Sequence, residues 1–394
     1  ANGDRRTIQA SGPFRLDPGA TNELIIGAVF VPGIDNHPKV DLTNLLFADD
    51  IAQAAFDNCF DIADGPDAPD VDWLELDQEI VGFLSNDQLN SNNFMEQYME
   101  VDLRAPDDSI MYVFEGYEVY QLRSPTSELN DVDNARLVFA TDIKNGVSEV
   151  YEYVAMPNTD GFEPDFLYER QLKADGPDEG IRKSFNLTTD AFTNQPLINH
   201  KKYYYRAIAY GYNNYLDFNG ITGVGQRFQY ILGRRNIRSY TVIPRPITTE
   251  KLNSKYGDGP IVTRTDGVGV GENFLEVSDE SRDAIFNESN EGKVIYEPGS
   301  SPIDVRVINP FEIIDGEYEL RITDSDGDDA LDSWIVTDQD GNETRSERSI
   351  MNLNEQLLGL YGFSVNIVQT DDVGQRLESS NGTIGFEVEY TDDM

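Results

Sequence analysis

The sequence predicts a mainly β protein that consists of tandem β-sandwiches and one short helical segment. Along most of the chain, apolar and polar residues alternate in short runs, as they do in strands that bury one face. Clusters of Gly, Pro, Asp and Asn separate these runs and are typical of tight turns. The third observation is that Leu197 precedes Tyr203 by six residues, and that Tyr203 opens a strand whose alternate positions are Tyr205, Ala207 and Ala209.

The spacing of Leu197 and Tyr203 resembles the turn and sixth strand of fibronectin type III domains. In that family the leucine closes the bottom of the sandwich, and the tyrosine hydroxyl bonds back to the backbone in a tyrosine corner. Residues 116–120 resemble the third strand of the same family. The resemblance implies a fibronectin type III or immunoglobulin-like sandwich, in which Leu197 and Tyr203 have structural roles.

We assign this sandwich to residues 64–246. It begins at residues 64–69, a linker by composition, and contains two long loops at residues 85–110 and 155–180. Its second strand lacks the tryptophan that is usual in the family, and Phe83 is expected to fill that space. The predicted strands are residues 73–76, 80–84, 111–122, 135–143, 147–154, 184–187, 203–212 and 238–243.

Residues 1–63 are predicted to contain the terminal hairpin of an incomplete β-sandwich, at residues 7–31, and an amphipathic helix at about residues 41–60. Within the hairpin, residues 24–31 read as a buried strand. Two strands do not make a stable domain alone. The hairpin is therefore expected to belong to a sandwich whose earlier strands lie outside this chain, or to pair with a later sheet or another molecule.

Residues 247–394 are predicted to form a second β-sandwich. Asp340 and Gly341 are a hairpin turn signal, and a short helix is expected near residues 280–287. The alternating runs in this region are residues 303–308, 318–322, 333–336, 363–367 and 384–389.

The chain is strongly acidic, with a formal net charge of −42 from 72 acidic and 30 basic residues. Such a chain repels nucleic acid and anionic membranes, which excludes both as partners. The longest apolar run is far too short to span a bilayer, so membrane insertion is not expected. The basic cluster of Arg234, Arg235 and Arg238 is predicted to pair with carboxylates of the same chain, with docking to an acidic partner as the other interpretation.

We expect no enzymatic activity from the sequence. The two histidines, His37 and His200, have no metal-ligand spacing to each other or to the single cysteine, Cys59. The chain also lacks the Gly-x-Ser-x-Gly elbow of serine hydrolases. Among 72 acidic residues, no pair of carboxylates stands out as the acid and base of a glycosidase.

The sequence predicts no cofactor, although calcium is a candidate ligand at one acidic turn. Asp324, Asp326 and Asp328 offer alternate carboxylates, which a hard cation prefers. The turn departs from an EF-hand loop because Gly327 comes fourth rather than sixth, and Ile335 stands where the last ligand would be. A calcium site and a solvated acidic turn therefore remain alternative interpretations.

Several segments together resemble the large secreted surface proteins that Bacteroidetes export through the type IX secretion system. These segments are residues 5–19, 49–60, 64–70, 114–122, 209–214 and 256–260. The resemblance implies an extracellular location at the bacterial cell surface. Asp108, Ser109 and Ile110 resemble the O-glycosylation sequon of these bacteria, so Ser109 is a candidate for glycosylation.

The expected function is that of a secreted structural or interaction protein of the cell surface, with self-assembly or adhesion as its activity. Its partners would be copies of itself or other surface proteins, bound through loops or through the edge of the N-terminal hairpin. The alternative is a carbohydrate-binding or spacer module of a secreted polysaccharide-degrading enzyme. In that case Tyr212 and Tyr215 are candidates for stacking on sugars.

Overall fold

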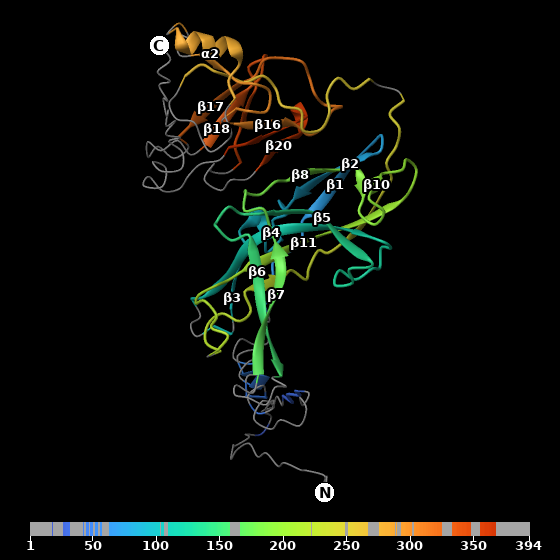
Figure 1. Cartoon of the computed structure of the whole chain (residues 1–394), viewed down its shortest axis with the longest axis vertical. Helices are drawn as coiled ribbons and strands as arrows, with labels where there is room; N and C mark the ends of the chain where they lie inside the picture. The colour runs from blue at the N-terminus through green and yellow to red at the C-terminus, as the bar shows by residue number, and fades with distance from the viewer. Residues whose placement is uncertain are drawn as a thin grey trace, which may run out of the picture. The chain divides into compact units, whose positions relative to one another are not determined.

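The computed structural model confirms a mainly β protein with antiparallel sheets (Figure 1). The chain divides into two compact units, Ala1–Ile62 with Pro157–Phe166, and Ala63–Met156 with Leu167–Met394. The second unit contains the named strands and helix α2 (Asp279–Phe286), which matches the short helix expected near this position. Apart from isolated residues, the structure describes residues 27–31, 63–102, 109–157, 166–221, 223–248, 251–266, 276–287, 293–301, 303–324, 333–347 and 355–367.

The first sandwich consists of two sheets. One sheet has three strands in the order β1 (Asp70–Leu76), β2 (Glu79–Ser85) and β8 (Ser184–Leu187). The other has six strands, with β11 and β4 side by side at its centre (Figure 1). Its members are β3 (Met99–Val101), β4 (Met111–Leu122), β5 (Ala135–Asp142), β11 (Tyr203–Tyr212), β12 (Tyr230–Leu232) and β13 (Ser239–Val242).

Side chains at alternate positions of the strands form the core between these sheets. In β11, Tyr203, Tyr205, Ala207 and Ala209 are all buried at 2% exposure or less, as the period of a strand requires of one face. They pack in one cluster with residues of the facing sheet, which include Ile80, Leu84 and Phe185. The tyrosine-rich strand is thus an inner strand of the sandwich.

The turn before β11 contains the phenol-to-backbone bond of a tyrosine corner. The Tyr203 hydroxyl accepts a hydrogen bond of 2.9 Å from the backbone N–H of Ile198. Leu197, next to this bond, is 1% exposed and belongs to the same core cluster.

Replacing Tyr203 by phenylalanine is expected to lower the free energy of unfolding by about 1 kcal/mol, because the ring stays packed while one hydrogen bond is lost. Chemical denaturation checks this value. Tyr204→Phe is the matched control, since Tyr204 is only half-buried and lies outside the core cluster. Equal stability of the two variants would contradict a structural role for the Tyr203 hydroxyl.

The tryptophan of this core comes from β1, and the prediction that Phe83 fills the space is wrong. Trp73 stacks on Tyr205 with ring centroids 5.0 Å apart and meets Phe185 edge-on at 5.7 Å. Gly82, opposite Trp73 in the register, leaves room for Phe185, since a Cβ there would lie 2.3 Å from the ring. Phe83 is the next residue along the strand, so its side chain lies on the other face.

The prediction of a long loop at residues 155–180 is wrong in part, because this segment contains a strand. β6 (Glu149–Pro157) pairs with β7 (Phe166–Asp175) in a two-stranded ribbon (Figure 1). Near its base, Val150 and Ala174 pack against Tyr210 of β11. β7 mixes charged and apolar residues and has no continuous buried face, which explains why its alternation is weak in the sequence.

Other short elements were also absent from the sequence prediction. The loop predicted at residues 85–110 contains β3 and the 3-10 turn η1 (Phe94–Glu96). β12 was not predicted either, and β9 (Thr189–Asp190) pairs with β10 (Gln195–Pro196) in a two-residue ladder.

The C-terminal region contains two further sheets of three strands each. Trp334 and Val336 of one sheet pack against Phe363 and Val365 of the other in one hydrophobic cluster. Gly341 has a φ of +82° in the turn that joins β18 to β19, which confirms the predicted hairpin. The strands are β16 (Asp304–Val307), β21 (Phe363–Asn366) and β20 (Gln356–Leu358), and β17 (Glu319–Thr323), β18 (Ser333–Thr337) and β19 (Glu343–Arg345).

Three smaller elements accompany these sheets. β14 (Thr263–Arg264) pairs with β15 (Val294–Ile295), and η3 (Gly359–Tyr361) lies between β20 and β21. The strand predicted at residues 384–389 lies outside the described residues.

A buried carboxylate joins the first sandwich to the C-terminal region. Glu355, which is 1% exposed, accepts hydrogen bonds of 2.8 Å from the backbone N–H groups of Lys183 and Ser184 and from the Ser184 hydroxyl. It also accepts one from the hydroxyl of Ser364, in β21. The junction is therefore a specific polar contact and not only a covalent linker.

Two ion pairs that share Asp304 lie at the same junction. Arg182 contacts Asp304 at 2.6 Å, and Arg306 contacts the same carboxylate oxygen at 2.7 Å. Burial alone would raise the pKa of Asp304, but Arg306 and Arg182 hold it below its usual value. The carboxylate is thus ionised at neutral pH and available to both arginines.

The smaller unit is described at few positions. Gly27–Val31 form no strand and Phe30 is 86% exposed, so the buried strand predicted there is wrong for these residues. Residues 7–26 of the predicted hairpin lie outside the described residues, except for Pro18. The predicted helix is present at its described positions, although Leu45 and Phe56 are 40% and 48% exposed. In the described part of the chain, no helix is long and apolar enough to cross a membrane.

Candidate functional site

Residues 65–69 are buried and Asp64 is half-buried, so the prediction of residues 64–69 as a linker is wrong. Proline and glycine are common in linkers, but they also suit a backbone that passes tightly between other segments. Here side chains and backbone of two loops bind almost every polar group of the segment. We call the set of Asp64, Asp67, Asn92, Glu100 and Arg235 the 64–69 network.

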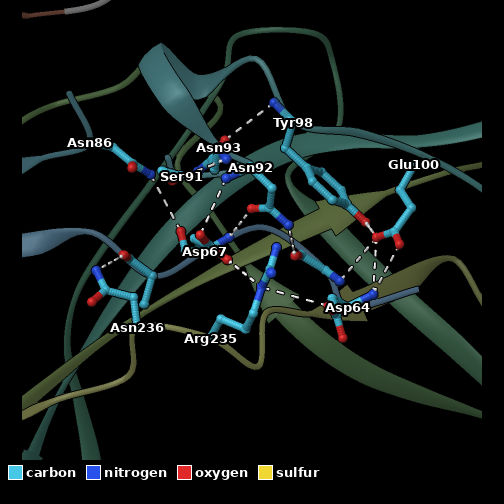
Figure 2. Close-up of polar contacts among 12 residues, drawn as sticks. Asp64, Asp67, Asn86, Ser91, Asn92, Asn93, Tyr98, Glu100, Arg235 and Asn236 are labelled. Carbon is cyan, nitrogen blue, oxygen red and sulfur yellow. Dashed lines mark hydrogen bonds and ion pairs between the residues drawn. The ribbon is translucent and has the colours of Figure 1, made fainter. Parts of the chain in front are cut away.

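Glu100, at the middle of β3, holds the start of this segment. Its carboxylate accepts hydrogen bonds from the backbone N–H groups of Asp64 at 3.0 Å and Gly65 at 3.3 Å. It also accepts one of 2.7 Å from the hydroxyl of Tyr98, which is 2% exposed. Figure 2 shows these bonds converging on the carboxylate.

Asp67 and Asn92 bind each other reciprocally. The Asn92 amide oxygen accepts a 2.7 Å bond from the backbone N–H of Asp67, and the Asp67 carboxylate accepts one of 3.2 Å from the N–H of Asn92. Arg235 donates to the same carboxylate at 3.1 Å and lies 3.6 Å from Asp64 (Figure 2). The carboxylate is therefore shared between an amide and a guanidinium group.

Two members of the basic cluster, Arg235 and Arg238, pair with carboxylates of their own chain, as predicted. Besides the contacts of Arg235, Arg238 lies 3.0 Å from Asp70. Both arginine side chains are more than half exposed, so each ion pair contributes little to stability on its own. Their effect is to fix the position of the segment next to β1.

Backbone contacts complete the arrangement. Ala68 donates to the carbonyl of Arg235 at 3.1 Å, and Arg234 donates to the carbonyl of Asp64 at 3.1 Å. The segment passes so close to Gly233 that a Cβ there would lie 1.8 Å from the carbonyl oxygen of Pro66. The 64–69 network can therefore clamp the chain, and its carboxylates are occupied by donors.

Three other carboxylates are buried in the six-stranded sheet. Burial raises the pKa of Glu115 to about 8 and that of Glu118 and Asp142 to about 7, each against a usual value near 4. Glu118 accepts a 2.7 Å bond from the hydroxyl of Tyr120. Perturbed carboxylates of this kind are candidates for a functional site or for control of stability by pH.

The loop that follows β11, residues 213–226, is held in place by ring contacts with the ribbon and by hydrogen bonds within the loop. We call it the contact loop; all of it except residue 222 is described. The ring of Phe218 lies between Tyr153 and Tyr168 of the ribbon, at centroid distances of 4.6 and 4.7 Å. Within the loop, Gln226 donates to the carbonyl of Leu216 at 2.7 Å, and Asn219 donates to that of Val224 at 2.8 Å.

This braced loop exposes apolar side chains. Leu216, Ile221 and Val224 are 51%, 87% and 58% exposed. Two side chains at its ends anchor it to the sheet, since Asn213 and Gln226 both donate to the buried carboxylate of Asp102. A fixed backbone with outward apolar side chains suits contact with another protein surface.

The site residues predicted from the sequence lie in different places. Ser109 is exposed, and Asp324 is half-buried just after β17. Asp326 and Asp328 lie outside the described residues, and the described residues contain no cluster of three or more metal-binding side chains. Tyr212 is half-buried beside the base of the ribbon, whereas Tyr215, in the contact loop, is 36% exposed.

A shallow hollow of about 480 Å³ lies against the first sandwich and the C-terminal region. Glu75, Arg245, Phe311 and Glu312 are among the residues that line it. Arg245 contacts Glu75 at 2.7 Å, so this ion pair occupies part of its wall.

The sequence interpretation singled out Tyr212 and Tyr215 where the chain leaves β11, but it missed the exposed apolar side chains of the contact loop and the 64–69 network. A signal for the loop was present, because isolated apolar residues stand among Asn and Gly between residues 213 and 226. The network gave no local signal, since its partners are far apart in the sequence. The chain matches no family model, no curated protein and no solved structure.

Proposed function

We propose that this protein is a secreted structural and interaction protein of the bacterial cell surface, and that it associates with copies of itself through the contact loop. The observation that carries the proposal is the exposure of Leu216, Ile221 and Val224 on a loop whose backbone is held in place. Because the loop is already ordered, binding would require little further loss of conformational entropy. Export through the type IX system remains a proposal from the resemblance described above.

The arrangement of the first sandwich supports a fibronectin type III-like module. The order β1-β2-β8 in one sheet and β13-β11-β4-β5 in the other, together with the Tyr203 hydroxyl bond, fits the resemblance seen in the sequence. In such a module the loop that leaves the sixth strand projects from one end of the sandwich. The contact loop follows β11, which is the corresponding strand.

The negative charge of the chain opposes self-association. Two chains of net charge −42 repel each other, so apolar contacts succeed only where salt screens the repulsion. We therefore expect association to strengthen as the ionic strength rises, unlike association driven by opposite charges.

Replacing Ile221 and Val224 together by serine is expected to weaken self-association at least roughly tenfold, because each side chain would otherwise be removed from water at the interface. Sedimentation velocity over a range of protein and salt concentrations measures the association. The matched control is Leu89→Ser, since Leu89 is also 87% exposed but lies in another loop.

The outcomes separate the possibilities clearly. A wild-type chain that stays monomeric at every protein and salt concentration rules out self-association. If the Ile221 and Val224 variant assembles as strongly as the Leu89 variant, the chain associates through another surface.

A further inference from the structure

The base of the β6–β7 ribbon is fastened to the sheet by carboxylates. Asn145 donates to both oxygens of Glu115 at 3.0 Å. Asp178, on the other side of the ribbon, accepts hydrogen bonds from the backbone N–H groups of Asn145 at 2.8 Å and Gly146 at 3.0 Å. Asp142, at the end of β5, accepts one of 2.7 Å from the N–H of Asp178. We call these four residues with acidic or amide side chains, Glu115, Asp142, Asn145 and Asp178, the ribbon clasp.

Asp142 is the most constrained member of the clasp. It is 0% exposed, and its Oδ2 atom has no hydrogen-bond partner among the described residues. The backbone of Gly176 packs directly against this carboxyl group, since a Cβ there would lie 2.0 Å from Oδ2. An ionised carboxylate in such a place lacks the donors that its charge requires, whereas a protonated carboxyl group loses less on burial.

The charges that act on Glu115 and Asp142 come from other acidic side chains. Asp142 and Asp178 act on Glu115, and Asp178 and Glu179 act on Asp142. From β11, Tyr210 faces both acids: burial and then these carboxylates raise its pKa, so it stays neutral. Lys144, the neighbour of Asn145 in the chain, is exposed to solvent. Ionisation of the clasp therefore adds repulsion to the cost of burial.

We propose that the ribbon clasp is a proton-operated fastening, which holds the base of the ribbon against the sheet when Glu115 and Asp142 are protonated and loosens when they ionise. The two loops that it holds are residues 143–148 and 176–180. Both connect the ribbon to the first sandwich, so loosening changes the freedom of the whole ribbon. The pH response of the clasp is unusual in its direction, because acidification tightens the structure.

The linkage sign follows from the pKa values of the folded protein. Burial raises the pKa of Glu115 from 4.5 to about 8 and that of Asp142 from 3.8 to about 7. A raised carboxyl pKa contributes stability that is fully present below the unfolded value and is lost as the pH rises through the folded value. The clasp should therefore weaken between about pH 4 and pH 8 and be loosest above pH 8.

Hydrogen exchange of the full chain, read by mass spectrometry at pH 5.5 and pH 8.5, tests the proposal. After correction for the intrinsic effect of pH on exchange, peptides that cover residues 143–150 and 174–180 should be at least roughly tenfold more protected at pH 5.5, since one pKa unit corresponds to a factor of ten. The double variant Glu115→Gln and Asp142→Asn should lose most of this pH dependence and stay protected at pH 8.5. Glu128→Gln, an exposed acid away from the clasp, should behave as the wild type.

Three results would overturn the proposal. The first is equal protection of the wild-type peptides at both pH values, which needs no variant and so does not depend on the folding of the double variant. The second is restoration of protection at pH 8.5 by added calcium, which would make the cluster a cation site. The third is a double variant that keeps the wild-type pH dependence, which would place the titrating groups elsewhere.

Discussion

Replacing Gly233 by alanine is expected to release residues 64–69 from the first sandwich and to lower its free energy of unfolding by about 3 to 5 kcal/mol. The added Cβ would lie 1.8 Å from the carbonyl oxygen of Pro66 and 3.0 Å from that of Ala209. Both obstacles are backbone atoms, so no side-chain rotation relieves the clash. Overpacking of this kind costs about 1 to 3 kcal/mol, and each hydrogen bond of the displaced segment adds about 1 kcal/mol.

Urea denaturation followed by fluorescence measures this loss, since Trp73 lies in the core of the same sandwich. Gly359→Ala is the matched control, because a Cβ at Gly359 would meet nothing within 4 Å and its φ is not positive. We expect the control to unfold like the wild type. If Gly233→Ala has the same free energy of unfolding as the control, the 64–69 segment does not pack against Gly233 as described.

The long strands of the first sandwich could be predicted from the sequence because their signals are local. β4, β8 and β11 have the predicted boundaries. Each alternates strongly or is buried on both faces, and turn residues flank it. The tyrosine corner could be found for the same reason, since the hydroxyl of Tyr203 and the N–H that it binds are five residues apart.

Features that depend on distant partners could not be predicted. The bonds of the 64–69 network join residues 25, 36 and 168 positions apart, and a sequence pattern carries no record of such pairings. β7 was missed because it mixes charged and apolar residues and has no continuous buried face, and β12 because it has three residues. The indole of Trp73 was assigned to no role, since the register that places it opposite Gly82 is a property of the sheet.

The buried acidic residues could not be predicted from the sequence either. Glu115, Glu118 and Asp142 are three among 72 acidic residues, and nothing in their sequence neighbourhood separates them from the exposed ones. For Glu115 and Asp142, burial arises because the loops that connect the ribbon contact these side chains through Asn145, Gly176 and Asp178. The pH response proposed for the clasp is therefore a consequence of the fold, not of composition.

Replacing Glu355 by alanine is expected to uncouple the first sandwich from the C-terminal region. The carboxylate is 1% exposed and receives hydrogen bonds from Lys183, Ser184 and Ser364. Its removal leaves backbone N–H groups of residues 183 and 184 without their acceptor, and a buried unsatisfied donor costs about 1 to 3 kcal/mol. We expect a loss of about 3 to 5 kcal/mol in the free energy that links the two regions.

Calorimetry distinguishes loss of coupling from general destabilisation. A wild-type chain whose regions unfold together should change to two separate transitions in Glu355→Ala, because neither region loses its own hydrophobic core. The unfolding of Glu355→Gln should be intermediate between that of the wild type and that of Glu355→Ala. The amide oxygen of the glutamine still accepts hydrogen bonds from one or two donors, but it carries no charge. The matched control is Glu343→Gln, which removes an exposed pair with Arg345 and should change little. A single unshifted transition in Glu355→Ala would mean that the carboxylate does not couple the two regions, and that the ion pairs of Asp304 suffice to hold them together.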